Sequence, residues 1–166
     1  MFQCEIKKLV THIIPIHYQL YPRSSARTDT EHHQSIRDQA NALLDNWLFL
    51  RGEPDERGKT SNFAHECLKR VCLGVFYSNT SKSLCQFPDF QTYVPYKALV
   101  LATAFVQVVL GVFSDHGCMP HQYKIDISKL KDSYDKLYRS LTRLAADKYH
   151  REKLDKMLED WATLGM

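Results

Sequence analysis

The sequence predicts an all-α fold, a single α-helical domain over residues 1–166 built as a bundle of about six helices around a central apolar helix at residues 96–116. Two observations lead to this prediction. Apolar residues recur with the 3.6-residue period of a helix in successive segments, and no segment keeps the alternation of a strand. The composition, with 44% hydrophobic and 25% charged residues, is that of a packed globular protein.

The first two helices are predicted over residues 2–20 and from about residue 31 onward. Pro15 should kink or end the first helix, because proline cannot donate the backbone hydrogen bond that the helix needs there. A polar loop follows, and Asp29 or Thr30 should cap the second helix. The apolar face of the second helix consists of Ile36, Ala40, Leu43, Leu44 and Trp47.

A third helix is predicted after the charged loop at residues 51–62, whose Thr-Ser-Asn end should cap it. The apolar positions of this helix are Ala64, Cys67, Leu68, Val71, Cys72 and Val75. The next connection, residues 78–95, carries the aromatic side chains Phe87, Phe90 and Tyr93. We expect it to pack over the core as an ordered loop.

The central helix contains the uncharged stretch ALVLATAFVQVVLGVF at residues 98–113, which raises the question of a membrane span. At the helical rise this stretch is about 24 Å long, short of the roughly 30 Å of hydrocarbon that a span must cross. We therefore expect the core helix of a bundle, with Pro95 as its first residue and Gly117 as its terminator. Its polar exceptions form one narrow stripe, either an edge left in water or a polar seam in the core: Thr103, Gln107, Gly111 and Ser114.

The last two helices are predicted from residue 127 to residue 146, capped by Asp126, and around Leu154–Trp161. Lys129, Lys136 and Arg143 are seven residues apart on the first of these, with Arg139 alongside. Such a row could contact phosphates of a nucleic acid, but acidic residues interrupt it, as on an ordinary solvated face.

No segment carries an established catalytic or metal motif. The densest group of reactive residues lies at positions 115–121, and its H-x-C-x2-H spacing is not a zinc pattern. Cys118 follows a helix C-terminus, where the helix dipole opposes a thiolate. Glycine-rich phosphate loops are absent from the sequence. We therefore predict no catalytic residue, no metal and no cofactor.

Charge and cysteine content bear on partners and compartment. The net charge of +3, from 22 basic and 19 acidic residues, is far from that of a dedicated nucleic-acid binder. The five cysteines are odd in number, and the first residues lack the pattern of a signal peptide. We expect an intracellular protein, cytoplasmic or nuclear, with no membrane partner.

Three motifs occur in a characteristic order. A Phe-rich entry with Phe90 and Pro95 precedes the Ala/Leu-rich helix, a turn at Gly117 follows it, and the next helix carries a Tyr-x3-Tyr-x2-Leu-x2-Leu pattern at residues 134–144. In this order the chain resembles an uncharacterised all-helical domain family that is expanded in basidiomycete, mushroom-forming fungi. Where that family tends to place an acidic residue and a Trp, this chain has Val112 and Phe113. The resemblance implies a fold and a lineage, and it implies no activity.

Two classes of function stay open. The first is a non-enzymatic helical interaction module that binds a protein, or alternatively a nucleic acid, with an unknown state of self-association. Its binding surface would consist of Phe87, Phe90 and Tyr93 or of Lys136, Arg139 and Arg143. The second is a small helical enzyme or ligand-binding bundle with a polar pocket near Thr103, Gln107 and His116. An apolar-walled cavity with converging polar groups would separate the two classes.

Overall fold

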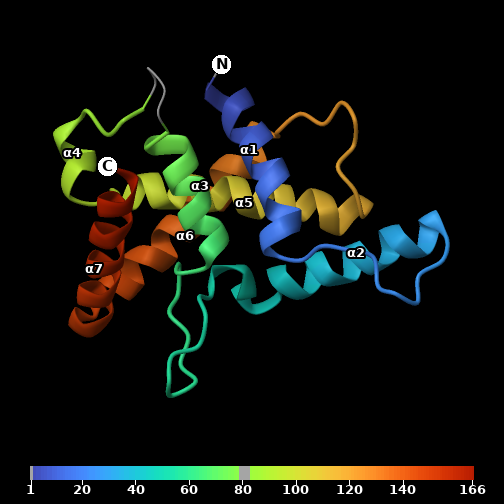
Figure 1. Ribbon diagram of the computed structural model, residues 1–166, viewed down its shortest axis with the longest axis horizontal. Coiled ribbons are helices and arrows are strands. Elements are labelled where there is room, and N and C mark those ends of the chain that lie inside the picture. Colours follow the sequence, from blue (N-terminus) through green and yellow to red (C-terminus); the bar gives the residue numbers. More distant parts are fainter. Residues whose placement is uncertain (1, 79–82) are drawn as a thin grey trace.

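The computed structural model describes residues 2–78 and 83–166, which form helices and loops and include no strand (Figure 1). The prediction of an all-α fold is confirmed. The elements are α1 (Phe2–His17), α2 (Asp29–Leu44), the 3-10 helix η1 (Asp45–Leu50), α3 (Glu66–Phe76), α4 (Pro88–Thr92), α5 (Tyr96–His116), α6 (Ile127–Ala146) and α7 (Lys148–Gly165).

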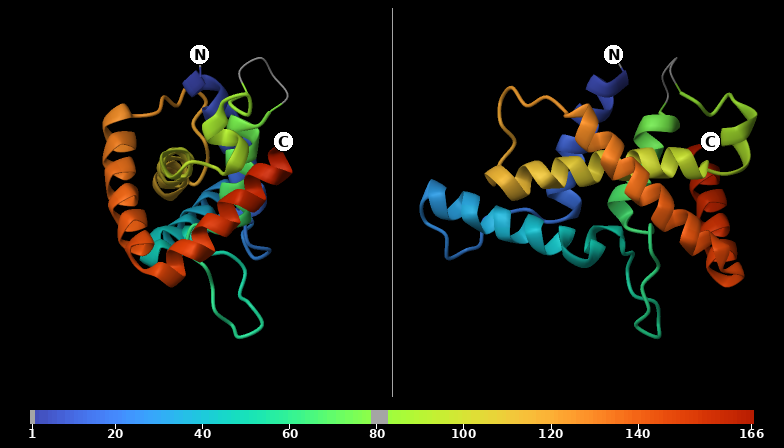
Figure 2. Two further views of the ribbon diagram at one scale, coloured as in Figure 1. Left: turned by 90° about the vertical axis from the view of Figure 1, so that its left-hand side faces the viewer. Right: turned by 180° about the vertical axis from the view of Figure 1, so that it is seen from behind.

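Helix α5 occupies the centre of the molecule, as the sequence predicts. The left panel of Figure 2 shows it nearly end-on, with α6 on one side and α1 and α3 on the opposite side. By length and composition alone α5 could cross a membrane, yet 67% of its most apolar window is buried among the other helices. Leu99, Phe105, Val109 and Leu110 are at most 2% exposed. Packing inside the bundle therefore accounts for the hydropathy of this helix.

The start of α2 differs from the prediction, because Thr28 caps it instead of Asp29 or Thr30. The Thr28 hydroxyl accepts a hydrogen bond from the Glu31 N–H at 3.2 Å, and the Glu31 carboxylate accepts one from the Thr28 N–H at 3.1 Å. This reciprocal capping box needs an acidic residue three positions after the cap, which only Thr28 has. Backbone N–H groups of Arg27 and Thr28 lower the pKa of the Glu31 carboxyl.

The start of α3 also differs. Residues 60–62 do not cap it, because the backbone of this segment is tied to the other side of the loop: the Gly52 N–H donates to the Ser61 carbonyl and the Ala64 N–H to the Leu50 carbonyl, both at 3.0 Å. The helix begins at Glu66, and His65 caps it by accepting from the Cys67 N–H through Nδ1 at 3.1 Å.

Of the other predicted helix boundaries, some are confirmed and some are wrong. Gly117 ends α5 in a left-handed conformation with φ of 69°, and the Asp126 carboxylate caps α6, so both predictions are confirmed. Pro95 precedes α5 as its cap and is not its first residue. Trp47 does not belong to α2, because α2 ends at Leu44. The first helix ends at His17, two residues beyond Pro15.

Candidate functional site

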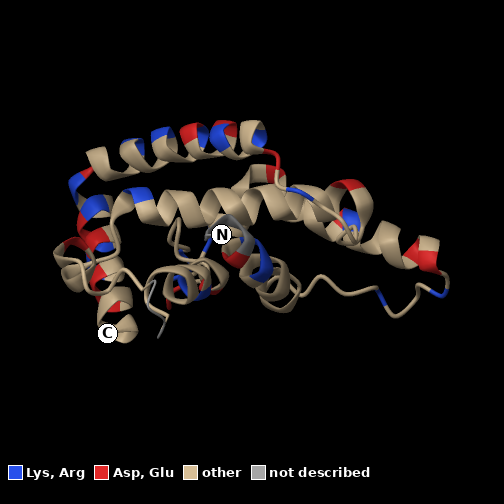
Figure 3. Cartoon of the chain, turned by 90° about the horizontal axis from the view of Figure 1, so that it is seen from above, with Lys and Arg blue, Asp and Glu red and all other residues tan. Residues whose placement is uncertain are grey.

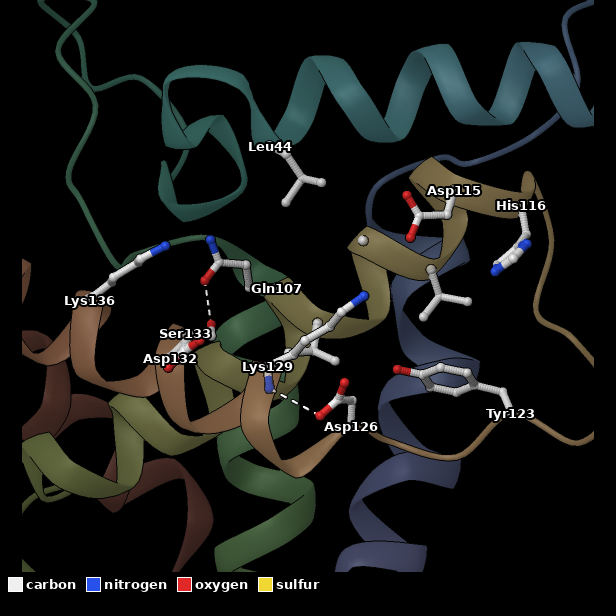
Figure 4. A pocket seen from close by; sticks show the side chains of 13 residues that line it. Leu44, Gln107, Asp115, His116, Tyr123, Asp126, Lys129, Asp132, Ser133 and Lys136 are labelled. Atoms are coloured by element: carbon white, nitrogen blue, oxygen red, sulfur yellow. Dashed lines mark hydrogen bonds between the residues drawn. The ribbon is translucent and has the colours of Figure 1, made fainter.

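A cavity of about 490 Å³ lies where α5, α6 and the end of α2 meet (Figure 4). It combines apolar side chains of α2 and α5 with charged and hydrogen-bonding groups from α5, from α6 and from the loop before α6. The lining residues are Leu44, Gln107, Val108, Gly111, Val112, Asp115, His116, Tyr123, Asp126, Lys129, Asp132, Ser133 and Lys136. Leu44, Val108 and Val112 give this cavity apolar surface, and most of its other lining residues are polar or charged.

The opening exists because α5 has no side chain at Gly111. A Cβ atom placed there would meet no atom within 4 Å. One turn further along the same face, the Ser114 hydroxyl donates to the Asn41 side-chain oxygen of α2 at 2.5 Å. The polar stripe of α5 therefore faces the space between α2 and α6, and glycine leaves that space unfilled.

Gln107 and Ser133 form a polar bridge between α5 and α6 at one end of the cavity. The Ser133 hydroxyl donates to the Gln107 side-chain oxygen, as the dashed line in Figure 4 shows. Ser133 is only 8% exposed, so this hydrogen bond is shielded from water. The Gln107 amide nitrogen donates to no group in the described part of the chain, which leaves two N–H donors for a ligand.

Charges of both signs surround the opening. Figure 3 shows α5 almost free of charged residues, whereas the neighbouring helix α6 alternates basic and acidic ones. Lys129 and Lys136 reach the cavity from α6, and Asp115 and His116 reach it from the last turn of α5. The Asp126 carboxylate is occupied in capping α6, where it accepts from the Ser128 N–H at 2.9 Å. The rim can thus pair with an anionic and a cationic group of one ligand.

Tyr123 supplies a hydroxyl donor to the wall. Burial, followed by the nearby carboxylates of Asp126 and Asp115, raises the pKa of the Tyr123 hydroxyl, so it stays protonated at neutral pH. Lys7 of α1 donates from Nζ to the Tyr123 carbonyl and lies 5.4 Å from the ring centroid. These contacts attach the loop between α5 and α6 to α1 and fix this wall of the cavity.

Among the described lining residues, no nucleophile is paired with a base. Ser133 donates to Gln107 and not to a histidine. The thiols of Cys67 and Cys72 lie in the core away from this cavity, and burial raises the pKa of Cys67 to about 12 and that of Cys72 further. Among the described residues, no group of three or more His, Cys, Asp or Glu side chains could hold a metal ion.

Of the three residues predicted to form a pocket, two line the cavity and one does not. Gln107 and His116 line the cavity together. Thr103 does not reach it, because its side chain is fully buried and donates to the Leu99 carbonyl of its own helix at 2.7 Å. Sequence reasoning missed Lys129 and Ser133 as pocket residues. Their spacing relative to Lys136 already places all three on one face of α6.

The aromatic residues proposed for a binding surface differ in exposure. Phe87 and Tyr93 are 50% and 44% exposed, whereas Phe90 packs against Phe76 with 5.5 Å between ring centroids. The connection carries the short helix α4, and residues 79–82 of it lie outside the described residues.

The three basic residues of α6 that were proposed for a binding surface have different surroundings. Lys136 lines the α5–α6 cavity and Arg143 lines another one. Arg139 lies between them in sequence and donates from Nε to the Asp135 carbonyl at 3.1 Å. The side chains of Lys136, Arg139 and Arg143 therefore contact different parts of the molecule.

Residues 1–144 match the family described as Domain of unknown function (DUF6532), and the chain belongs to that family. The match runs from α1 into the last turns of α6 and leaves α7 outside. The resemblance to an uncharacterised domain family is thereby confirmed. No curated protein and no solved structure matches the chain.

Proposed function

We propose that the chain is a non-enzymatic helical binding module whose cavity between α5 and α6 takes up a small amphipathic ligand carrying charges of both signs. The observation that carries this proposal is the unfilled space at Gly111, where an apolar floor meets a polar rim. A volume of about 490 Å³ falls within the range of small-molecule sites in proteins.

The lining suggests how such a ligand would lie. An apolar part would cover Val108 and Val112, where Gly111 leaves room between the helices. An anionic group would pair with the lysine ammonium groups of α6, and a cationic group would pair with Asp115. The free N–H donors of Gln107 would fix the orientation of the ligand between these ends.

A thermal-shift screen with a panel of metabolites, including amino acids and other zwitterions, tests this proposal. A ligand at about 100 times its Kd should stabilise the fold by about 2.7 kcal/mol, which raises Tm by about 5–10 °C for a chain of this size. Gly111→Leu should abolish the shift, because the new side chain enters the open space and meets no atom near its Cβ.

Thr142→Leu is the matched control, since it adds the same side chain at an exposed position of α6 that does not line the cavity. It should leave the shift unchanged. The proposal fails if no member of the panel raises Tm, or if Gly111→Leu responds to the ligand as strongly as the unsubstituted protein does.

A second candidate is a protein partner bound through Phe87 and Tyr93, and their exposure on the segment around α4 favours it. Photo-crosslinking from position 87 should capture a defined partner, and Tyr93→Ser should reduce the yield several-fold. Tyr21→Ser is the control, because Tyr21 is a tyrosine with a similar exposure of 53%. Equal yields from both variants would exclude this surface.

A nucleic-acid partner is the weaker version of the interaction module. It would use Lys136, Arg139 and Arg143, and it draws support only from their net positive charge on α6. Reversing all three charges should then lower the salt concentration at which the protein leaves heparin. Unchanged retention would remove this version.

We extend the family assignment to a basidiomycete lineage and to an intracellular setting. The order of the Phe-rich entry, the Gly117 turn and the Tyr-rich helix supports the lineage, and free buried thiols at Cys67 and Cys72 are compatible with a reducing compartment. A phylogeny of the family and microscopy of a tagged protein would test the two statements separately.

A further inference from the structure

A second cavity, of about 430 Å³, lies at the junction of η1, the base of the loop between η1 and α3, the end of α6 and the start of α7. In Figure 1 this loop extends below the bundle, and its base joins η1 to α3. The cavity is separate from the one at Gly111 and shares no lining residue with it. Its lining residues are Asn46, Trp47, Leu50, Arg51, Asn62, Phe63, Ser140, Arg143, Leu144, Asp147 and His150.

Positive charge dominates this lining. The guanidinium groups of Arg51 and Arg143 form no ion pair and no hydrogen bond with any part of the chain that the structure describes. Asp147 brings the opposing charge, and its carboxylate is occupied in capping α7, where it accepts from the His150 N–H at 3.0 Å. Two unpaired guanidinium groups in one cavity favour an anionic ligand with several oxygen atoms.

Neutral hydrogen-bonding groups accompany the two arginines. The side chains of Asn46, Asn62 and Ser140 line the cavity and form no hydrogen bond within the described chain. They offer amide and hydroxyl donors to the same oxygen atoms. A ligand would therefore complete the hydrogen bonding of groups on η1, on the loop before α3 and on α6 that have no protein partner in the described chain.

Trp47 adds a flat aromatic surface to the cavity. Asn46 and Trp47 have φ of 51° and 58°, and Phe63 across the cavity has φ of 59°. These are three of the four residues other than glycine with positive φ in the described chain, the fourth being Gln19. Such backbone geometry is unfavourable for residues with side chains and concentrates at binding sites. Trp47 itself is half-buried and lines the cavity.

We propose that this cavity binds a phosphate-bearing ligand with a planar ring, of the mononucleotide class. Arg51 and Arg143 would hold the phosphate through paired N–H donors, and Trp47 would stack on the ring. The amides of Asn46 and Asn62 would bond to the remaining polar atoms. This assignment goes beyond the proposed function, because it concerns different residues and a different ligand chemistry.

Fluorescence titration with adenosine monophosphate tests the proposal directly. Of the two tryptophans, Trp47 lines the cavity and Trp161 is only 5% exposed, so quenching on addition of the ligand reports on this site. Saturable quenching is expected. Adenosine, which lacks the phosphate, should bind at least tenfold more weakly, and inorganic phosphate should compete with adenosine monophosphate.

Arg143→Gln should weaken the binding of adenosine monophosphate about tenfold or more, and Arg51→Gln should do the same. Arg139→Gln is the matched control, because it removes the same charge from α6 at a residue that does not line the cavity. Circular dichroism and Tm should be alike in all three variants. Gly111→Leu should not affect this binding, which separates the result from that of the α5–α6 cavity.

Three results would overturn the proposal. The first is the absence of tryptophan quenching at millimolar adenosine monophosphate. The second is a failure of specificity. Adenosine and its monophosphate would then bind with equal affinity, or Arg139→Gln and Arg143→Gln would lose the same amount of affinity for adenosine monophosphate. The third is binding of a single-stranded oligonucleotide without binding of the mononucleotide, which would assign these residues to a nucleic-acid surface instead.

Discussion

Leu110 and Gly111 are neighbours in α5, yet their surroundings differ completely. The Leu110 side chain is fully buried in the core, whereas a Cβ at Gly111 would meet no atom within 4 Å. One helix therefore has a face packed to the density of a protein interior and a face that borders an open cavity. The apolar residues of α5 therefore form the core, while its few polar and small residues shape the candidate site.

The packed face gives the largest expected effect. Leu110→Ala should lower the free energy of unfolding by about 2–5 kcal/mol, because it removes buried methyl groups and leaves a cavity that neighbours fill only in part. Urea denaturation followed by circular dichroism measures the change. A loss below about 1 kcal/mol would mean that the two faces of α5 are less different than the structure indicates.

Gly117, at the end of α5, is the packed counterpart of Gly111. Gly117→Ala should lower the free energy of unfolding by about 1–3 kcal/mol, because φ is 69° and the new Cβ would lie 2.2 Å from the His33 carbonyl oxygen. Gly58→Ala is a control with the same backbone geometry, φ of 71°, and open space around the Cβ. A loss at Gly117 no greater than that at Gly58 would contradict the close contact.

The Gln107–Ser133 hydrogen bond lies at the border of the two faces. A double-mutant cycle with Gln107→Leu and Ser133→Ala should give a coupling energy of about 1 kcal/mol, the usual net value for a shielded hydrogen bond. Chemical denaturation of the four proteins provides the measurement. A coupling energy of zero would show that the bridge between α5 and α6 does not contribute to stability.

The open face gives the smallest effect, with the opposite sign. Gly111→Ala should raise the free energy of unfolding by about 0.5–1 kcal/mol, because alanine restricts the unfolded chain and suits a helix interior better than glycine. Thermal unfolding should show a rise in Tm of a few degrees. A decrease would indicate that the space at Gly111 is already filled in solution.

The sequence was sufficient for the central helix, for its end at Gly117 and for the start of α6 at Asp126. An uncharged stretch flanked by amphipathic segments has few other places in a bundle, and Gly117 and Asp126 are residue types with strong positional preferences. The predicted caps of α2 and α3 were both wrong, for different reasons. Several residues in each loop can cap a helix, and the choice depends on the Thr28–Glu31 pair and on hydrogen bonds across the loop before α3.

The candidate site was predictable in part. The spacing of Gln107, Gly111 and Ser114 places them on one side of α5, but spacing within a helix does not reveal which other helices face that side. Leu44 and Tyr123 reach the cavity from α2 and from the loop before α6, and only the tertiary arrangement brings them there. Thr103 shares the stripe but bonds to its own helix, a local alternative that sequence alone leaves open.

Helix α7 follows the residues that match the family and still belongs to the folded unit. Leu158 is fully buried and its carbonyl accepts from the Val94 N–H at 3.2 Å, while the Asp155 carboxylate accepts from the Tyr96 hydroxyl. The range of the family match and the range of the packed unit thus differ in this chain. A relative with an unrelated last helix must supply other acceptors where α5 begins, so sequence drift after residue 144 should be coupled to changes at residues 94–96.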